Sequence, residues 1–414
     1  MLKNIKSTLI TILIILFIFE IFLRINGRYN HAAEHKYVIS ESIFEPQPKT
    51  HLVWDHPDLR NGVVNNYDQS GVNNFFFEID TSKKNNIIGI FGDSFAENIF
   101  VFNEYRIDKI LQKLFNNKFE IVNYGVNGYG LDQIFLRYKK YKNHDLKKIV
   151  YVFIENDFRN LYENQLVEYD VDGALKFREI KINKFYFILN KIHLSYFFLE
   201  FYYILNAMKV YGFKTEVAEG TIKWLQSRDE LKQNFSEKFV KDSRNQKKRL
   251  EDYYASSMLR EVIDLKPSKE TMLYLKKFND LLSNLNEIIK RDNREFLIVV
   301  GPRSIDTVAF KSIVKEIDNY NVLFLEEKFL NLESFVYKDF FFKNDYHWNE
   351  FGNLYAAKFI FDKLMIGVGI NKIGDAIDQQ DKIIDSSINE IKNIYKCFNA
   401  KPICNDTKIR NLAY

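Results

Sequence analysis

The pattern of apolar and polar positions divides the chain into regions with and without a regular alternation. Short apolar runs at residues 86–91, 119–124 and 147–154 are typical of buried strands. Apolar residues at helical spacing follow the first two runs, over residues 105–115 and 131–141. Strands that alternate with helices in this way predict a parallel sheet covered by helices.

The same alternation returns after residue 267. Apolar residues at helical spacing predict an amphipathic helix over residues 268–289. Strands are expected at 295–300 and 322–325, and a last helix at 354–364. The predicted fold class is therefore α/β, a doubly wound parallel sheet.

Residues 161–266 interrupt the pattern and are interpreted as a helical insertion. They contain an aromatic stretch at 185–205 and a highly charged one at 230–252. The aromatic stretch carries too many polar residues for a membrane span. It is interpreted either as a core helix of an inserted subdomain or as a helix lying on the membrane surface. The charged stretch is typical of a solvated helical face.

The N-terminus has the features of an uncleaved signal anchor. A short basic head with Lys3 and Lys6 precedes an apolar run over residues 8–25, about the length that crosses a bilayer core. No small-residue cleavage site follows. The two lysines favour a cytoplasmic N-terminus, although two arginines on the far flank weaken that argument. A buried N-terminal helix is the alternative.

These features predict a division of the chain into five parts. The parts are a membrane anchor at 1–28, a polar lead-in segment at 29–85, an α/β domain at 86–160 and 267–370, the helical insertion at 161–266, and a C-terminal tail at 371–414. Cys397 and Cys404 in the tail form either a small disulfide loop in an oxidising compartment or a free pair. With no histidine at ligand spacing, they make a poor metal site.

Composition and charge narrow the function only slightly. The 414 residues are 46% hydrophobic, which is enough for a full core. The net charge of +4 is close to balanced, and the basic residues are scattered. Nucleic acid is therefore not an implied partner.

Candidate chemistry begins where the first predicted strand ends. The segment FGDSF, residues 91–95, places Ser94 just after that strand and close to a glycine. Ligands of open parallel sheets bind outside the carboxyl ends of the strands, so Ser94 is well placed as a nucleophile. Taken alone the signal is weak, since Asp93 or Ser94 can equally cap the helix that follows.

The ends of the next two predicted strands also carry residues that could take part in catalysis. The second ends in NYGVNGYG, residues 123–130, and the third in Glu155, Asn156 and Asp157. The sheet topology would bring these ends to one rim. The backbone N–H groups of Ser94 and Gly128 and the side-chain amide of Asn156 then suggest an oxyanion hole. Turn formation by the glycines and capping by residues 156 and 157 are the alternatives.

A serine nucleophile needs a base, and the chain has seven histidines. Six of them lie in the lead-in segment, in a polar loop or in the aromatic stretch: His31, His35, His51, His56, His144 and His193. His347 alone lies where the last strand passes into the last helix. Asp345, two residues earlier, can lie close to the imidazole and fix its tautomer.

Four segments together resemble a known superfamily. FGDSF (91–95), NYGVNGYG (123–130), ENDF (155–158) and NDYHWNEFGN (344–353) resemble, in order, the four signature blocks of the SGNH, or GDSL-type, hydrolases. The resemblance implies a flavodoxin-like sheet, Ser94 as nucleophile, Gly128 and Asn156 as oxyanion donors, and Asp345 with His347 completing the triad. It covers about a third of the chain and finds no counterpart for the insertion.

Two departures from the family pattern stand out. Glu155 occupies the position that is usually glycine in the third block. The acid and base are spaced Asp-x-His rather than the commoner Asp-x-x-His. The form Asp-x-His-Trp-Asn, with a glycine soon after, looks like the membrane-tethered branch that includes polysaccharide O-acetyl-modifying proteins.

The resemblance implies a serine esterase or acyltransferase that acts on O-acyl esters, O-acetyl esters above all, of an envelope or exported glycan. No metal or organic cofactor is implied. The expected partners are the ester substrate, the membrane through the N-terminal helix, and a membrane acyl donor, with the catalytic domain on the periplasmic or extracellular side. A lipid esterase or thioesterase would use the same triad. A catalytically inactive envelope protein that binds glycan or a partner is the third alternative.

Overall fold

The computed structural model describes a large part of the chain. It covers Thr11 and residues 14–18, 37–40, 43–46, 51–54, 63–67, 72, 87–116, 118–178, 257–332, 340–342, 347–365 and 373–399. The chain forms two compact units, Met1–Lys36 with Lys181–Lys241, and Tyr37–Ile180 with Asp242–Tyr414. The described residues of the first unit are Thr11 and residues 14–18. The sheet and the candidate site belong to the second unit.

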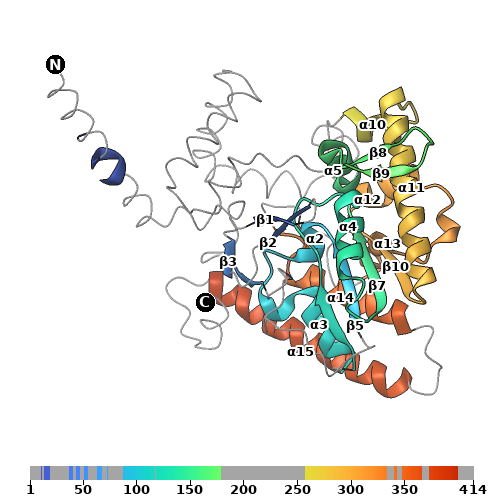
Figure 1. Ribbon diagram of the computed structural model, residues 1–414. Coiled ribbons are helices and arrows are strands. Elements are labelled where there is room, and N and C mark those ends of the chain that lie inside the picture. Colours follow the sequence, from blue (N-terminus) through green and yellow to red (C-terminus); the bar gives the residue numbers. More distant parts are fainter. Residues whose placement is uncertain are drawn as a thin grey trace. The chain divides into compact units, whose positions relative to one another are not determined.

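The second unit contains a parallel sheet of five strands (Figure 1). The strands are β5 (Ile87–Gly92), β6 (Glu120–Asn123), β7 (Leu146–Phe153), β10 (Glu295–Val300) and β11 (Val322–Phe324). Their order across the sheet is β11-β10-β7-β5-β6, and each neighbouring pair is parallel. The predicted α/β class with a parallel sheet is confirmed.

The strand order has a consequence for ligand binding. The first strand of the sheet along the chain, β5, lies between the second and the third, β6 and β7. This is the flavodoxin-like arrangement, in which the connections leave β5 and β7 in opposite directions. The carboxyl ends of β5 and β7 therefore form the topological switch point, beside which ligands of such sheets bind.

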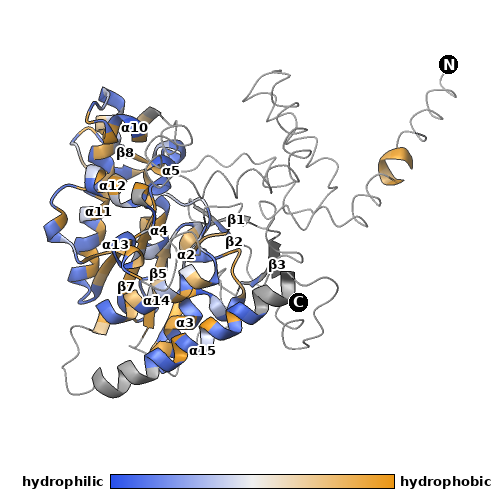
Figure 2. Cartoon of the chain, turned by 180° about the vertical axis from the view of Figure 1, so that it is seen from behind, coloured by the Kyte–Doolittle hydropathy of each residue, from blue (hydrophilic) through white to orange (hydrophobic). Residues whose placement is uncertain are grey.

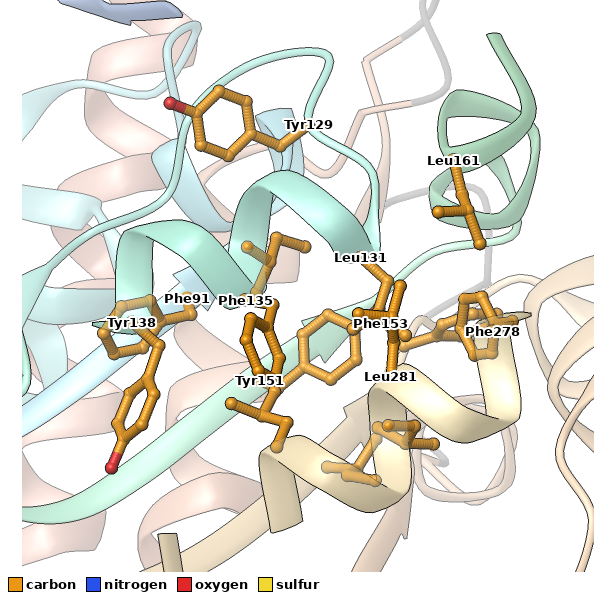
Figure 3. Close-up of a cluster of buried hydrophobic side chains, with 14 of the residues drawn as sticks. Phe91, Tyr129, Leu131, Phe135, Tyr138, Tyr151, Phe153, Leu161, Phe278 and Leu281 are labelled. Carbon is orange, nitrogen blue, oxygen red and sulfur yellow. The ribbon is translucent and has the colours of Figure 1, made fainter. Parts of the chain in front are cut away.

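Side chains of the strands alternate between two buried layers. Tyr151 and Phe153 of β7 face one layer, whereas Val150 and Val152 face the other. The first layer is covered by α4 (Leu131–Tyr141), α5 (Asn156–Asn164), α10 (Ser257–Ile263), α11 (Lys269–Arg291) and α12 (Ser304–Ile313). Figure 3 shows Phe278 and Leu281 of α11 in this layer beside Phe153, whose ring centroid lies 6.0 Å from that of Phe278.

The second layer lies on the other face of the sheet. It is covered by α3 (Ile107–Leu114), α13 (Leu325–Leu330), α14 (Glu350–Met365) and α15 (Ile373–Asn399). A short helix, α2 (Ser94–Glu97), follows β5, and two 3₁₀ turns span Asn103–Tyr105 and Ile317–Asn319. Because the strands are buried on both faces, their side chains are apolar almost throughout, which is why the apolar runs predicted them.

The lead-in segment contributes two antiparallel hairpins. They pair β1 (Tyr37–Ser40) with β2 (Ile43–Pro46), and β3 (His51–Trp54) with β4 (Val63–Asn66). The segment is joined to the α/β domain by buried polar contacts. Glu45 accepts a hydrogen bond from Arg137 Nη1 at 2.7 Å, and Asn65 Nδ2 donates to the Ile99 carbonyl at 2.9 Å. Polar anchoring of this kind leaves little apolar pattern in the sequence.

The insertion and the tail contain elements that the sequence pattern did not predict. Within 161–266, α10 is helical as expected, whereas β8 (Val167–Tyr169) and β9 (Leu175–Phe177) form an antiparallel hairpin that was not expected. The aromatic and charged stretches lie outside the described residues. The expected tail contains α15, whose buried Ile384 and Ile391 belong to the second layer. Cys404 and the side chain of Cys397 are also outside the described part.

The expected membrane anchor is described only in part. Thr11 and residues 14–18 are helical, with Ile14, Ile15, Phe17 and Ile18 between 52% and 66% exposed (Figure 2). The remaining residues of 8–25 lie outside the description. Among the residues that are described, no helix combines the length and hydropathy of a membrane span.

Candidate active site

Ser94 is the first residue of α2, directly after β5. The preceding turn needs glycine at position 92, where φ is +152°. A Cβ atom there would lie 2.7 Å from the Val152 carbonyl oxygen and 2.8 Å from Ala96 Cβ. Asp93 caps the helix, since its Oδ1 accepts a hydrogen bond from the Phe95 N–H at 2.9 Å. The capping role considered for Asp93 is thus observed, and Ser94 follows the cap.

The structure brings Ser94 and His347 together. Nε2 of His347 lies 2.8 Å from Oγ of Ser94, although 253 positions separate the two residues in the chain. That distance is within the range required for proton transfer between a hydroxyl nucleophile and its base. Asp345, expected to orient the imidazole, lies outside the described residues.

Aromatic contacts hold the imidazole in place. The ring of Phe95 stacks on His347 with centroids 4.7 Å apart, and Phe100 meets it edge-on at 5.1 Å. The next residue, Trp348, donates its indole N–H to the Phe95 carbonyl at 3.1 Å. The backbone N–H of Phe342 donates to the His347 carbonyl at 3.1 Å. The base is therefore attached to the helix that carries the nucleophile.

The position of His347 in the fold differs in detail from the expected one. It precedes α14, as predicted, but α13 separates β11 from this segment and α15 follows α14. Neither helix was predicted. α13 is a single short helix of six residues, which is too short to give a periodic pattern.

Asn156 lies at the carboxyl end of β7 and begins α5. Its Nδ2 donates to Asp93 Oδ2 at 2.9 Å, so it is joined to the nucleophile turn through the residue before Ser94. A side-chain amide has two N–H donors, and this contact uses one of them.

Gly128 lies in the turn after β6, at φ +77°, where a Cβ would meet no atom within 4 Å. This turn is attached to the nucleophile turn. Val126 N–H donates to the Gly92 carbonyl at 3.1 Å, and Asn127 N–H donates to Glu97 Oε2 at 2.6 Å. A Cβ on Gly125 would lie 2.5 Å from the Glu97 nitrogen, so the turn packs directly on α2.

Sequence reasoning missed an ionic cluster at the carboxyl end of β10. Asp306 accepts hydrogen bonds from the Glu155 N–H at 3.2 Å and the Arg303 N–H at 3.1 Å, which joins the ends of β7 and β10. The Arg303 guanidinium pairs with the Glu155 carboxylate, and its Cζ lies 5.0 Å from the centre of the Phe95 ring. The glutamate in place of the usual glycine is thus 2% exposed and paired with a cation.

The only signal for this cluster in the sequence was its place after a fourth strand. Gly301 follows β10 directly, and a Cβ there would lie 2.6 Å from Asp306 Oδ2. No motif marks Arg303 or Asp306, because ordinary ion pairs have no characteristic spacing in sequence.

Two buried carboxyl groups lie beneath the nucleophile turn. Burial raises the pKa of Asp93, against hydrogen bonds from Phe95 and Asn156 that lower it. Burial, and next the charge of Asp93, raise the pKa of Asp157 well above its ordinary value. Tyr151 donates its hydroxyl to Asp157 Oδ2 at 2.7 Å. Because like charges disfavour one another, ionisation of Asp93 makes ionisation of Asp157 less favourable.

In the part of the chain that the structure describes, no three His, Cys, Asp or Glu side chains are grouped as a metal site would require. Near the switch point the hydroxyl of Ser94, the imidazole of His347 and the side-chain amide of Asn156 supply a nucleophile, a base and an N–H donor. Such a set suits acyl transfer.

Comparisons with known proteins give little further guidance. No protein-family model matches the chain, and no curated protein matches it. One similar solved structure is that of a protein from Desulfitobacterium hafniense DCB-2 described as lipolytic and of the G-D-S-L family. The identity is 8% and the TM-score 0.33, over 67% of this chain and 99% of the other. A likeness this low shows no shared function.

Proposed function

We propose that this protein is a serine esterase or acyltransferase in which Ser94 is the nucleophile and His347 the general base. The observation that carries the proposal is the 2.8 Å contact between Nε2 of His347 and Oγ of Ser94. It is supported by the place of that contact at the carboxyl end of β5, beside the topological switch point. A histidine with a purely structural role would not need to contact a serine, and it would not need to lie at this edge of the sheet.

The reaction proceeds in two halves. Oγ of Ser94 attacks the ester carbonyl carbon while its proton passes to Nε2 of His347. The tetrahedral intermediate then breaks its bond to the alcohol oxygen, which leaves with the proton from the imidazolium. Water or a sugar hydroxyl attacks the carbonyl carbon of the resulting acyl-enzyme and gives its proton to His347. The bond from that carbon to Oγ then breaks, and the imidazolium returns the proton to Oγ, which regenerates Ser94.

The developing oxyanion is stabilised by N–H donors from three strand ends. These are the backbone N–H groups of Ser94 and Gly128 and the second amide N–H of Asn156. Asp93 supports the arrangement, because it holds the first N–H of the Asn156 amide at 2.9 Å and so limits its rotation. Donors fixed before the reaction need no reorganisation when the charge forms.

Asp345 completes the proposed triad. From a position two residues before His347, its carboxylate would accept the Nδ1–H of the imidazole and stabilise the imidazolium. The motif resemblance supports this role.

The proposed substrate is a small O-acyl ester, O-acetyl above all, on an envelope or exported glycan. The Asp-x-His-Trp-Asn form of the last motif supports this class, and so does the apolar segment at residues 8–25, proposed to anchor the domain on the outer side of the membrane. Acetyl esters should then be cleaved faster than long-chain esters of the same alcohol. The reverse order would favour a lipid esterase.

Active-site labelling tests the proposal. A fluorophosphonate bearing a fluorophore should label the full-length protein, with the adduct on the peptide that contains Ser94. Ser94→Ala should abolish labelling. Ser268→Ala is the matched control, since that hydroxyl caps α11 through the N–H and the hydroxyl of Thr271, and it should label normally. A folded wild-type protein that never labels would favour a binding protein without catalysis.

A further inference from the structure

A buried glutamate connects the lead-in segment with the turn that carries Gly128. Glu97, the last residue of α2, is completely buried. Its Oε1 accepts a hydrogen bond from the Tyr67 hydroxyl at 2.5 Å, and its Oε2 accepts one from the Asn127 N–H at 2.6 Å. One carboxyl group therefore contacts a residue before the sheet begins and the residue before Gly128.

The contact with Asn127 fixes the part of the turn that matters for the reaction. The residues before it are already held, since Tyr124 N–H donates to the Ile90 carbonyl at 2.7 Å and Val126 N–H to the Gly92 carbonyl at 3.1 Å. Gly128 is at φ +77°, and a Cβ added there would meet no atom within 4 Å. Among the described contacts, the bond to Glu97 is the last one before that residue.

We propose that Glu97 is a positioning residue for the oxyanion turn, and that Tyr67 of the lead-in segment controls how firmly it holds that turn. The inference rests on the proposed function, since it assigns a role to the turn that carries Gly128. Glu97 acts through the Asn127 N–H and does not touch the substrate.

The protonation state of Glu97 determines the strength of this contact. Burial raises the pKa of Glu97 to about 7, against the hydrogen bonds from Tyr67 and Asn127 and the charges of Arg137 and Arg106, which lower it. The hydroxyl of Tyr129 is another titratable group that interacts with Glu97, and burial keeps it neutral by raising its pKa. The carboxyl group therefore changes charge near neutral pH.

Of the two contacts described for the carboxyl group, the one with Tyr67 favours the added proton. A backbone N–H can only donate, so a proton on Oε2 would face the Asn127 N–H. A tyrosine hydroxyl can turn from donor to acceptor, so the proton goes to Oε1. Oε2 then remains an acceptor but loses its charge, and a bond to a neutral acceptor is about half as strong. The turn is held more weakly in acid.

Glu97→Gln is the direct test, because its amide reproduces the protonated form. The oxygen can accept from Asn127 while the NH₂ group donates to Tyr67. With phenyl acetate and the full-length protein, we expect kcat about 10-fold below wild type above pH ~8, equal values below pH ~6, and an unchanged KM. Every other titrating group is common to the two proteins, so the ratio of their pH profiles isolates Glu97.

Tyr67→Phe gives an independent test that does not alter the carboxyl group. Loss of the hydroxyl donor raises the pKa of Glu97 further, so the rise of kcat with pH should move to higher pH. Tyr138→Phe is the matched control, since that hydroxyl contacts Asp292 at 3.3 Å, and it should leave the profile unchanged. The double variant with Glu97→Gln should show no shift from Glu97→Gln alone.

The outcomes separate this inference from the proposed function. If Ser94→Ala is inactive but Glu97→Gln and Tyr67→Phe follow the wild-type profile, the positioning role is wrong and the triad stands. If Glu97→Gln does not fold, the Tyr67→Phe profile decides alone. Turnover that survives in Ser94→Ala overturns the proposed function itself.

Discussion

The indole N–H of Trp348 donates to the backbone carbonyl of Phe95 at 3.1 Å, which ties the residue after His347 to the residue after Ser94. Phe95 joins the two chain segments through two contacts. Its carbonyl accepts this bond, and its ring stacks on His347 with the ring centroids 4.7 Å apart. The proposed catalytic pair is therefore held by its immediate neighbours.

Replacing His347 by glutamine should remove most of the activity. The amide cannot accept and return a proton, so kcat for a short-chain aryl ester should fall by about 10³-fold or more, with little change in KM. Steady-state kinetics with a thermal melt would check this. Turnover within about 10-fold of wild type, in a folded variant, would show that His347 is not the base.

Asn156→Ala tests the oxyanion hole. Loss of one donor should lower kcat by about 10²- to 10³-fold and leave KM nearly unchanged, because the missing bond forms only in the transition state. Asn164→Ala is the control on the same helix. Its amide contacts Gln133 at 2.6 Å, so it should retain normal kcat. Equal losses in both variants would indicate a structural effect of α5.

Two glycines should respond differently to alanine. At Gly92 the added Cβ would meet the Val152 carbonyl oxygen at 2.7 Å, in addition to the cost of φ +152°. At Gly128 it would meet nothing within 4 Å. Gly128→Ala should cost about 1–2 kcal/mol of unfolding free energy and Gly92→Ala several kcal/mol. Urea unfolding measures the free energy lost in each variant. Equal losses would mean that the backbone of β5 at Gly92 moves away from Val152 of β7 and so relieves the contact.

The ion pair between Glu45 and Arg137 should stabilise the attachment of the lead-in segment. The side chains of Glu45 and Arg137 are 3% and 1% exposed, so Glu45→Ala removes the carboxylate that neutralises a buried guanidinium. The expected loss is about 3–5 kcal/mol. Glu163→Ala breaks an exposed pair with Arg159, 60% and 43% exposed, and should cost less than about 1 kcal/mol. Urea unfolding of both variants would reveal whether the buried pair is as important as its burial implies.

Stability should fall as the pH rises toward neutral. Burial raises the pKa of Glu97 from 4.5 to about 7, so the folded state binds this proton more tightly than the unfolded chain does. Its contribution is complete below about pH 4.5 and is lost as the pH passes through about 7, roughly 3 kcal/mol in all. Glu97→Gln should flatten the dependence by that amount. An equally steep curve in the variant would assign it to other groups.

Much of the α/β domain could be predicted because its strands are buried on both faces. The apolar run at 147–154 corresponds to β7 (Leu146–Phe153), and the helix predicted at 131–141 is α4 (Leu131–Tyr141). Burial on two sides imposes an apolar run, and burial on one side imposes helical spacing. Both leave a direct record in the sequence.

The elements that were missed lack such a record or were overlooked. β8 and β9 have three residues each, which is too short for a pattern. The lead-in hairpins dock through Glu45 and Asn65, and polar contacts have no period. α15 is different, since isoleucines such as Ile384 and Ile391 recur at helical spacing. That pattern is sufficient to predict an amphipathic helix.

The candidate site was predictable where motifs mark it. Ser94 follows a strand and Asn156 follows a neighbouring one, so the topology alone places them on one edge. His347 was expected at the same edge because it alone among the seven histidines lies where the last predicted strand passes into the last helix, and the motif resemblance supported that expectation. Glu97 and Arg303 carry no motif, and their importance depends on partners that lie far away in the sequence.

The bond between Trp348 and Phe95 also affects how the site tolerates motion. A displacement of the segment before α14 would carry the short helix of Ser94 with it, so the imidazole and the hydroxyl would travel as a pair. Thermal motion of the helices that cover the sheet would then change access to Ser94 more than it changes the distance between Nε2 of His347 and Oγ of Ser94.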